Sequence, residues 1–129
     1  MSSAGICRIL FIDDSAEEVF FASYRLDKGG IRVDPRTVAD GPGLRKALTS
    51  WPPDLSVCPF SLHHLDGFEA LEISREQAPA VPFLFRSGAI GEGRASEARR
   101  RGAYDAVDKD DYDRFLQLVS QIAEHTPAR

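Results

Sequence analysis

The feature that most constrains the fold is the alternation of short apolar runs with longer stretches of helical periodicity. A near-continuous apolar run indicates a strand that is buried on both faces, as in a parallel sheet. We predict strands at 8–12, 31–38, 55–60, 81–86 and 104–108. The predicted helices follow them, from Ser15 to about 28, at 42–50, from 66 onward, at 92–101 and at 111–124. Five strand–helix repeats predict an α/β fold, with one open parallel sheet that is covered on both faces.

Two local signals refine this prediction. Ser15 and Glu18 have the spacing of a capping box, in which the Ser15 hydroxyl and the Glu18 carboxylate each accept the other residue's backbone N–H. Pro35 lies inside the strand predicted at 31–38 and cannot donate a ladder hydrogen bond. That strand is therefore expected at an edge of the sheet.

Length and composition exclude several classes of protein. The 129 residues fit one domain, 1–129, and we expect 1–5 and 126–129 to be flexible. The net charge of −4 argues against a surface that binds nucleic acid. Apolar runs such as 81–85 are too short for a membrane span or a secretory signal, so we expect a cytoplasmic protein. Cys7 and Cys58 have no metal-ligand spacing and are predicted to be reduced core residues.

Polar side chains follow the predicted strands at the points where the strands end. Asp13 and Asp14 follow the first strand, Ser87 follows the fourth and Lys109 follows the fifth. The carboxyl ends of parallel strands meet at one edge of the sheet, where α/β proteins place their binding sites. Two carboxylates suit a hard cation, and a hydroxyl with an ammonium suits phosphate oxygens. The sequence therefore predicts a site for a divalent cation and a phosphoryl group.

These residues belong to a wider set of matching segments. They are Ile-Leu-Phe-Ile-Asp-Asp-Ser (9–15), Ala-Asp-Gly (39–41), Pro-Asp-Leu (53–55), Leu-Asp-Gly-Phe-Glu-Ala-Leu (65–71), Val-Pro-Phe-Leu-Phe-Arg-Ser-Gly (81–88) and Gly-Ala-Tyr-Asp-Ala-Val-Asp-Lys (102–109). In this order and spacing, the chain resembles a response-regulator receiver domain of two-component signalling over nearly its whole length. The resemblance implies a flavodoxin-like, doubly wound fold of three layers, with five parallel strands in the order 2-1-3-4-5 and five helices.

The resemblance also shows where the chain departs from the family. Receiver domains accept a phosphoryl group on an Asp at the end of the third strand, and that position is Pro59 here. Pro59 carries no nucleophile, so the acyl phosphate of the family cannot form there. The aromatic switch position is Ala106, and the Pro that usually follows the family's Lys is Asp110. The phosphoryl pocket of Asp13, Asp14, Ser87 and Lys109 would then be a relic.

Alternatives remain open for these residues. Asp13 and Asp14 could hold Mg²⁺ weakly, or Lys109 could be the direct counter-ion of one of them; we favour the second interpretation. Ser87 could equally be a turn residue. His63 and His64 lack the spacing of a shared metal site and are expected to be solvated. Ser61 or His64 would be a poorly placed substitute acceptor.

The charged residues of the last third of the chain support two further predictions. Strand parity predicts that Arg86 and Asp108 form an ion pair on the face opposite Ser87 and Lys109. A second set of charges forms either a solvated face or an interaction surface, which in receivers lies on the fourth helix, fifth strand and fifth helix and could support a homodimer. Its members are Arg94, Arg99, Arg100, Arg101, Asp108, Asp110 and Asp111.

The leading hypothesis for function is an atypical receiver that acts as a protein-interaction module without phosphorylation. It would not be an enzyme, it would need no cofactor beyond a weak Mg²⁺, and it would bind a sensor histidine kinase, a phosphotransfer protein or another receiver. The first alternative is a receiver that is phosphorylated on another side chain or still responds to Mg²⁺. The second is a flavodoxin-like nucleotide binder, but the acidic loop at 13–18 would repel a phosphate.

Overall fold

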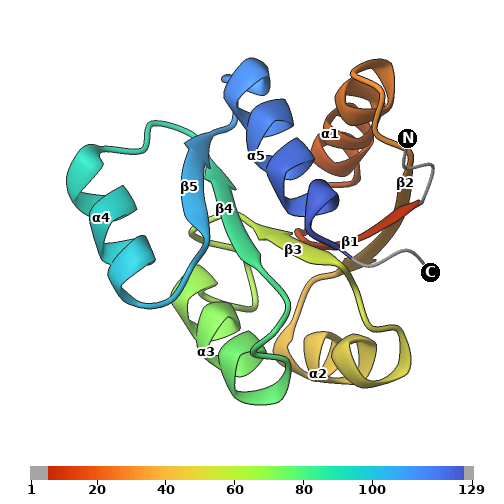
Figure 1. The fold of residues 1–129 in the computed structure, drawn as a ribbon. Helices are drawn as coiled ribbons and strands as arrows, with labels where there is room; N and C mark the ends of the chain where they lie inside the picture. Colours follow the sequence, from red (N-terminus) through yellow and green to blue (C-terminus); the bar gives the residue numbers. More distant parts are fainter. Residues whose placement is uncertain (1–5, 127–129) are drawn as a thin grey trace.

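A computed structural model describes residues 6–126 of the chain, so the termini expected to be flexible lie almost wholly outside the described residues. Five parallel strands form one sheet in the order β2-β1-β3-β4-β5, which confirms the predicted strand order (Figure 1). The strands are β1 (Cys7–Ile12), β2 (Val33–Val38), β3 (Leu55–Cys58), β4 (Phe83–Ser87) and β5 (Asp105–Asp108).

Five helices cover the two faces of the sheet. They are α1 (Ala16–Lys28), α2 (Gly41–Ser50), α3 (Gly67–Gln77), α4 (Glu92–Arg100) and α5 (Tyr112–Glu124). Helices α1 and α5 lie side by side on one face, and the other three lie on the opposite side (Figure 1). None of the helices within residues 6–126 combines the length and the apolar character that a membrane span requires.

The core is divided into two clusters by the sheet, because successive side chains of a strand point to opposite faces. Along β1, Ile9 and Phe11 pack with α1 and α5, whereas Leu10 and Ile12 pack with α2 and α3. All four side chains are buried. The apolar run of β1 is near-continuous because helices cover both faces of the sheet at this strand.

Prolines influence the end of one strand and the position of another. Strand β3 ends at Cys58, two residues before the predicted end, and Pro59 follows it without an N–H to donate. Strand β2 contains Pro35 and lies at an edge of the sheet, as expected. Both cysteines are buried, Cys7 in the cluster beneath α1 and α5 and Cys58 in the other cluster.

The ion pair predicted between Arg86 and Asp108 is wrong, because the register of β4 and β5 is displaced by one residue from the one assumed. Arg86 aligns with Val107, and Asp108 aligns with Ser87. Aligned residues in a parallel pair face the same side, so Arg86 and Asp108 point to opposite faces of the sheet. The Asp108 carboxylate instead accepts the backbone N–H of Asp110 at 3.0 Å.

Candidate functional site

The polar residues predicted to meet at the carboxyl edge of the sheet do follow neighbouring strands. Asp13 and Asp14 come directly after β1, Pro59 after β3 and Lys109 after β5, while Ser87 is the last residue of β4. The order of the strands brings these ends to one edge (Figure 1). The contacts among the side chains, however, differ from the predicted ones.

Glu18, which the sequence analysis assigned only to a helix cap, holds the two cations of this edge. Its Oε2 lies 3.4 Å from Nζ of Lys109, and its Oε1 lies 3.5 Å from Nη1 of Arg86. The expected pairing of Lys109 with Asp13 or Asp14 is therefore wrong. One carboxylate from the first turn of α1 is bound by β4 on one oxygen and by the residue after β5 on the other.

The capping box is only half formed, which explains why Glu18 is available. The Ser15 hydroxyl accepts the backbone N–H of Glu18 at 3.2 Å, as predicted. The reciprocal bond is absent between these two residues, because the N–H of Ser15 donates to Oδ1 of Asp13 at 2.9 Å. Asp13 thus accepts the N–H that the Glu18 carboxylate would accept in a full capping box. The Glu18 carboxylate contacts residues at the ends of the strands.

Arg86 is a buried cation, with a side chain that is 5% exposed. Its Nη2 donates to the carbonyl of Lys109 at 3.2 Å and to the hydroxyl of Tyr112 at 3.1 Å. Its guanidinium carbon lies 5.2 Å from the ring centre of Tyr112 and 5.3 Å from that of Phe115. Its Nε has no hydrogen-bond partner among the residues that the structure describes. The Glu18 carboxylate is therefore its counter-ion in a poorly hydrated place.

The two aspartates after β1 have different surroundings. Burial raises the pKa of Asp13, an effect opposed by the N–H of Ser15 and reinforced by the negative charges of Asp14 and Glu18. The pKa of Asp14 is lowered, first by the backbone N–H of His63 and also by its ring. Asp14 Oδ2 lies 2.9 Å from that nitrogen and 2.8 Å from Nδ1 of the ring. His63 is exposed, as expected of a solvated loop residue, and it also binds Asp14.

The loop after β3 is tightly packed around Pro59. An added Cβ at Gly67 would lie 2.6 Å from the carbonyl oxygen of Pro59 and 2.7 Å from that of Phe60. The N–H of Phe60 donates to the Ser87 hydroxyl at 3.3 Å. Ser87 therefore binds the backbone of this loop, while His64 and Ser61 are exposed and lie in isolated bridges with Asp40 and Asp66.

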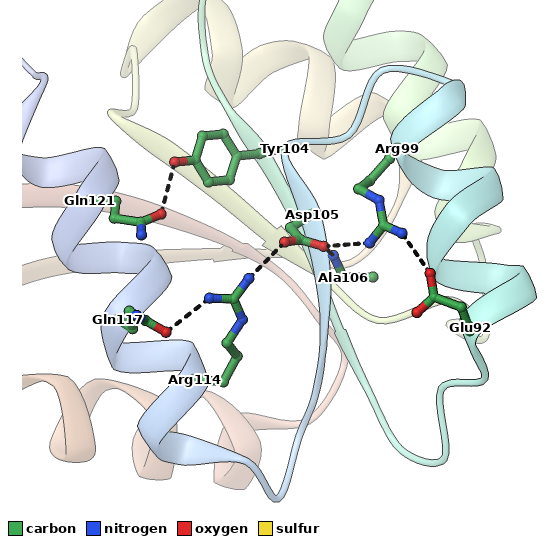
Figure 2. Close-up of polar contacts among 8 residues, drawn as sticks. All are labelled: Glu92, Arg99, Tyr104, Asp105, Ala106, Arg114, Gln117 and Gln121. Carbon is green, nitrogen blue, oxygen red and sulfur yellow. Dashed lines mark hydrogen bonds and ion pairs between the residues drawn. The ribbon is translucent and has the colours of Figure 1, made fainter.

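The charges predicted to form an interaction surface are largely paired within the chain. The Asp105 carboxylate binds Arg99 of α4 at 3.0 Å and Arg114 of α5 at 3.2 Å (Figure 2). Arg99 also binds Glu92 at 2.8 Å. Beside Ala106, these residues line an open hollow of about 260 Å³ between α4 and β5.

Most other residues of the predicted surface also make contacts within the chain. Arg101 binds Glu72 and Glu97 and lies over the ring of Phe68, and Arg94 lies over the ring of Phe60. Asp111 caps α5 by accepting the N–H of Arg114, and Asp110 donates its N–H to Asp108. Arg100 is exposed.

Sequence reasoning missed three members of the edge: Glu18, Tyr112 and the bond from His63 to Asp14. The signal for Glu18 was its position in the first turn after a strand that ends at the site. To use that signal, one must know which side of α1 faces the ends of the strands. Nothing in the sequence marks Tyr112 as the partner of a strand arginine.

Comparison with known proteins places these features in context. No family model matches the chain. It is 29% identical over 119 residues to the nitrogen assimilation regulatory protein NtrX of Azorhizobium caulinodans, covering 90% of this chain and 26% of that protein. It is 31% identical over 81 residues to the DNA-binding transcriptional regulator NtrC of Proteus hauseri, covering 62% of this chain and 17% of the regulator. The chain thus spans about a quarter or less of the length of these relatives.

A solved structure matches over nearly the full length. The receiver domain of NtrX from Brucella abortus superimposes with a TM-score of 0.79 and 28% sequence identity, covering 92% of this chain and 99% of that domain. Both the strand order and the position of the acidic pair after β1 agree with the resemblance seen in the sequence. In its fold and in its sequence, the chain is therefore similar to the receiver domain of NtrX.

Proposed function

We propose that this receiver domain acts in two-component signalling as a protein-interaction module that works without phosphorylation of an aspartate. The observation that carries the proposal is the pairing of Lys109 and Arg86 with Glu18 at an edge where Pro59 occupies the acceptor position. The lysine that would bind a phosphoryl group already has a carboxylate partner, and the residue that would carry that group has no nucleophile.

The magnesium ion that the resemblance implies does not fit the residues at this edge. Mg²⁺ demands near-octahedral oxygen coordination, usually with carboxylates. Pro59 replaces the third carboxylate, Asp14 Oδ2 is bound by His63, and Asp13 Oδ1 is bound by Ser15. Within residues 6–126, no group of three or more His, Cys, Asp or Glu side chains is arranged to hold a metal. We therefore propose a module that does not depend on Mg²⁺.

The switch that would report phosphorylation is also replaced. Ala106, at the aromatic position, has a methyl group that packs against the cluster beneath α2, α3 and α4, and its N–H donates to the Asp105 carboxylate at 2.8 Å. A methyl group has no rotamers to change. The signalling state of the domain would then depend on whether a partner is bound.

The partners we propose are a sensor histidine kinase, a phosphotransfer protein or another receiver, and we propose a cytoplasmic location for them to meet. These classes follow from the resemblance to response regulators. The chain would occupy a docking surface on such a partner without receiving its phosphoryl group.

Incubation with acetyl phosphate and Mg²⁺, followed by intact-mass measurement, tests this function. We expect no added phosphoryl group on the wild-type chain, while a receiver with its acceptor Asp, treated in parallel, gains one. An adduct on the wild-type chain would overturn the proposal. Peptide mapping would then show whether Ser61 or His64 is the substitute acceptor, since both are exposed beside the site.

A further inference from the structure

Helix α1 has an outward stripe that the proposed function does not use. Val19, Ala22 and Leu26 are buried against the sheet and α5. With 100° between successive helical residues, the opposite side carries a continuous line of side chains. Its members, all exposed, are Glu17, Phe20, Phe21, Tyr24 and Lys28, which we call the α1 stripe.

The centre of the α1 stripe is aromatic. Phe20 is 64% exposed, Phe21 46% and Tyr24 49%. The rings contact one another, with centres 5.7 Å apart for Phe20 and Phe21 and 6.3 Å apart for Phe20 and Tyr24. Isolated exposed apolar residues are common, but a contiguous aromatic patch on a helix marks a site of association.

The ends of the α1 stripe carry opposite charges. Glu17 lies in the first turn of the helix and Lys28 in the last. The two are eleven residues apart, which is about 16 Å along the axis and close to three full turns. An antiparallel second α1 would therefore bring Lys28 of that copy opposite Glu17 and align the aromatic centres of both stripes. The two helix dipoles would also be antiparallel.

We propose that the α1 stripe is a self-association surface, on which α1 of a second copy packs antiparallel about a two-fold axis near Phe21 and Tyr24. A two-fold interface uses the same patch on both subunits, so the patch must be complementary to itself. The α1 stripe meets this condition, since it has an apolar centre and one charge of each sign at opposite ends.

The surface of α4, β5 and α5 satisfies this condition less well. Arg99, Arg101 and Arg114 are already bound to carboxylates of the same chain. A second copy would have to replace those partners to gain new ion pairs. The α1 stripe offers Glu17 and Lys28 without such competition, since neither forms an ion pair within residues 6–126, where Lys28 lies over the ring of Tyr24 at 5.7 Å.

Sedimentation equilibrium over a wide range of chain concentration tests this proposal. One helix face buries less area than a standard interface, so we expect a reversible dimer with a dissociation constant on the order of 10–100 µM. Tyr24→Glu should weaken the dimer at least about tenfold, because it places two charges in the aromatic centre. The substitution is at an exposed position, and circular dichroism should show an unchanged fold.

A charge exchange gives the sharper test. Glu17→Lys alone and Lys28→Glu alone should each weaken the dimer, because like charges then face each other at both ends. The double variant Glu17→Lys/Lys28→Glu should return close to the wild-type affinity. Arg100→Glu, on the exposed side of α4, is the matched control and should leave the affinity of the dimer unchanged.

Three results would overturn the proposal. The first is a wild-type chain that stays monomeric at all concentrations, which would assign the α1 stripe to a different protein. The second is a dimer that Tyr24→Glu does not weaken. The third is a double charge exchange whose defect equals the sum of the two single defects.

Discussion

Two carboxylates in this domain are each bound by two cations, yet the surroundings of the two clusters differ. Glu18 binds Arg86 and Lys109 at the carboxyl edge of the sheet. Asp105 binds Arg99 and Arg114 between α4 and α5 (Figure 2). In the Glu18 cluster one cation is buried, since the Arg86 side chain is 5% exposed. In the Asp105 cluster both cations are exposed, at 42% and 43%.

The contrast between the two clusters shows where charge affects the stability of the fold. A buried cation that loses its counter-ion keeps the full cost of its lost hydration. An exposed cation regains water, and its ion pair contributes about 0–1 kcal/mol. The arginine-rich α4 is therefore conspicuous in the sequence but energetically modest, whereas Glu18 is inconspicuous and important.

The largest expected effect comes from Glu18→Gln. It leaves Arg86 without a counter-ion, and we expect the free energy of unfolding to fall by about 2–3 kcal/mol, less than for a fully buried pair because Glu18 is itself 34% exposed. Urea denaturation measures the change. Glu17→Gln, one position earlier and exposed, is the matched control and should change stability by less than about 0.5 kcal/mol. Equal effects for the two variants would remove the distinction between the clusters.

The next effect in size is that of Tyr112→Phe. It keeps the ring over Arg86 but removes the hydroxyl that accepts the Nη2 bond, and we expect a loss of about 1–1.5 kcal/mol. Tyr104→Phe removes an exposed hydroxyl that contacts Gln121 at 3.3 Å, and its loss should stay below about 0.5 kcal/mol. Thermal unfolding of both variants measures the two losses of stability. A larger loss for Tyr104→Phe would contradict the importance of burial here.

The sequence predicted the fold better than the site, and particular residues show why. Strand order, both faces of β1 and the edge position of Pro35 follow from periodicity and from the missing N–H of proline. The prediction of an ion pair between Arg86 and Asp108 was wrong because it required the register of β4 and β5 to be known to within one residue. Register is set by the packing of both strands, and a shift of one residue moves a side chain to the other face.

The contacts of Glu18 were beyond sequence reasoning for a related reason. The carboxylates of Glu18 and Asp13 could each accept the N–H of Ser15, and the carboxylate of Asp13 accepts it. The half-buried carboxylate of Glu18 and the buried guanidinium of Arg86 are separated by 68 residues in sequence. Only the assembled sheet brings them together.

A smaller effect is expected from Asp14→Asn, and it should depend on pH. The folded state lowers the pKa of Asp14, so the charged form contributes stability that is present above the unfolded pKa and lost as pH falls through the folded pKa. We expect a loss of about 0.5–1 kcal/mol at pH 7, as for a partly exposed hydrogen-bonded pair. Urea denaturation should show this difference shrinking toward zero as the solution is acidified below the folded pKa. If wild type and Asp14→Asn differ in stability by the same amount at pH 7 and below the folded pKa, the assigned pairing with His63 is contradicted.

The smallest effect is expected from Arg99→Gln in the Asp105 cluster. Asp105 keeps Arg114 as a partner, and we expect the smallest loss of stability among these variants, one that diminishes further at high salt. Chemical denaturation at low and high salt checks both statements. A loss comparable to that of Glu18→Gln would make the two clusters equivalent.

We propose that Glu18 and its two cations hold the carboxyl edge together and that this edge takes up neither a phosphoryl group nor Mg²⁺. The most direct measurement follows the backbone amide resonances of Asp13, Asp14, Ser87 and Lys109 by NMR while Mg²⁺ and then acetyl phosphate are added. We predict that these four resonances stay in place. Saturable shifts confined to them would show a working receiver site and would contradict the account.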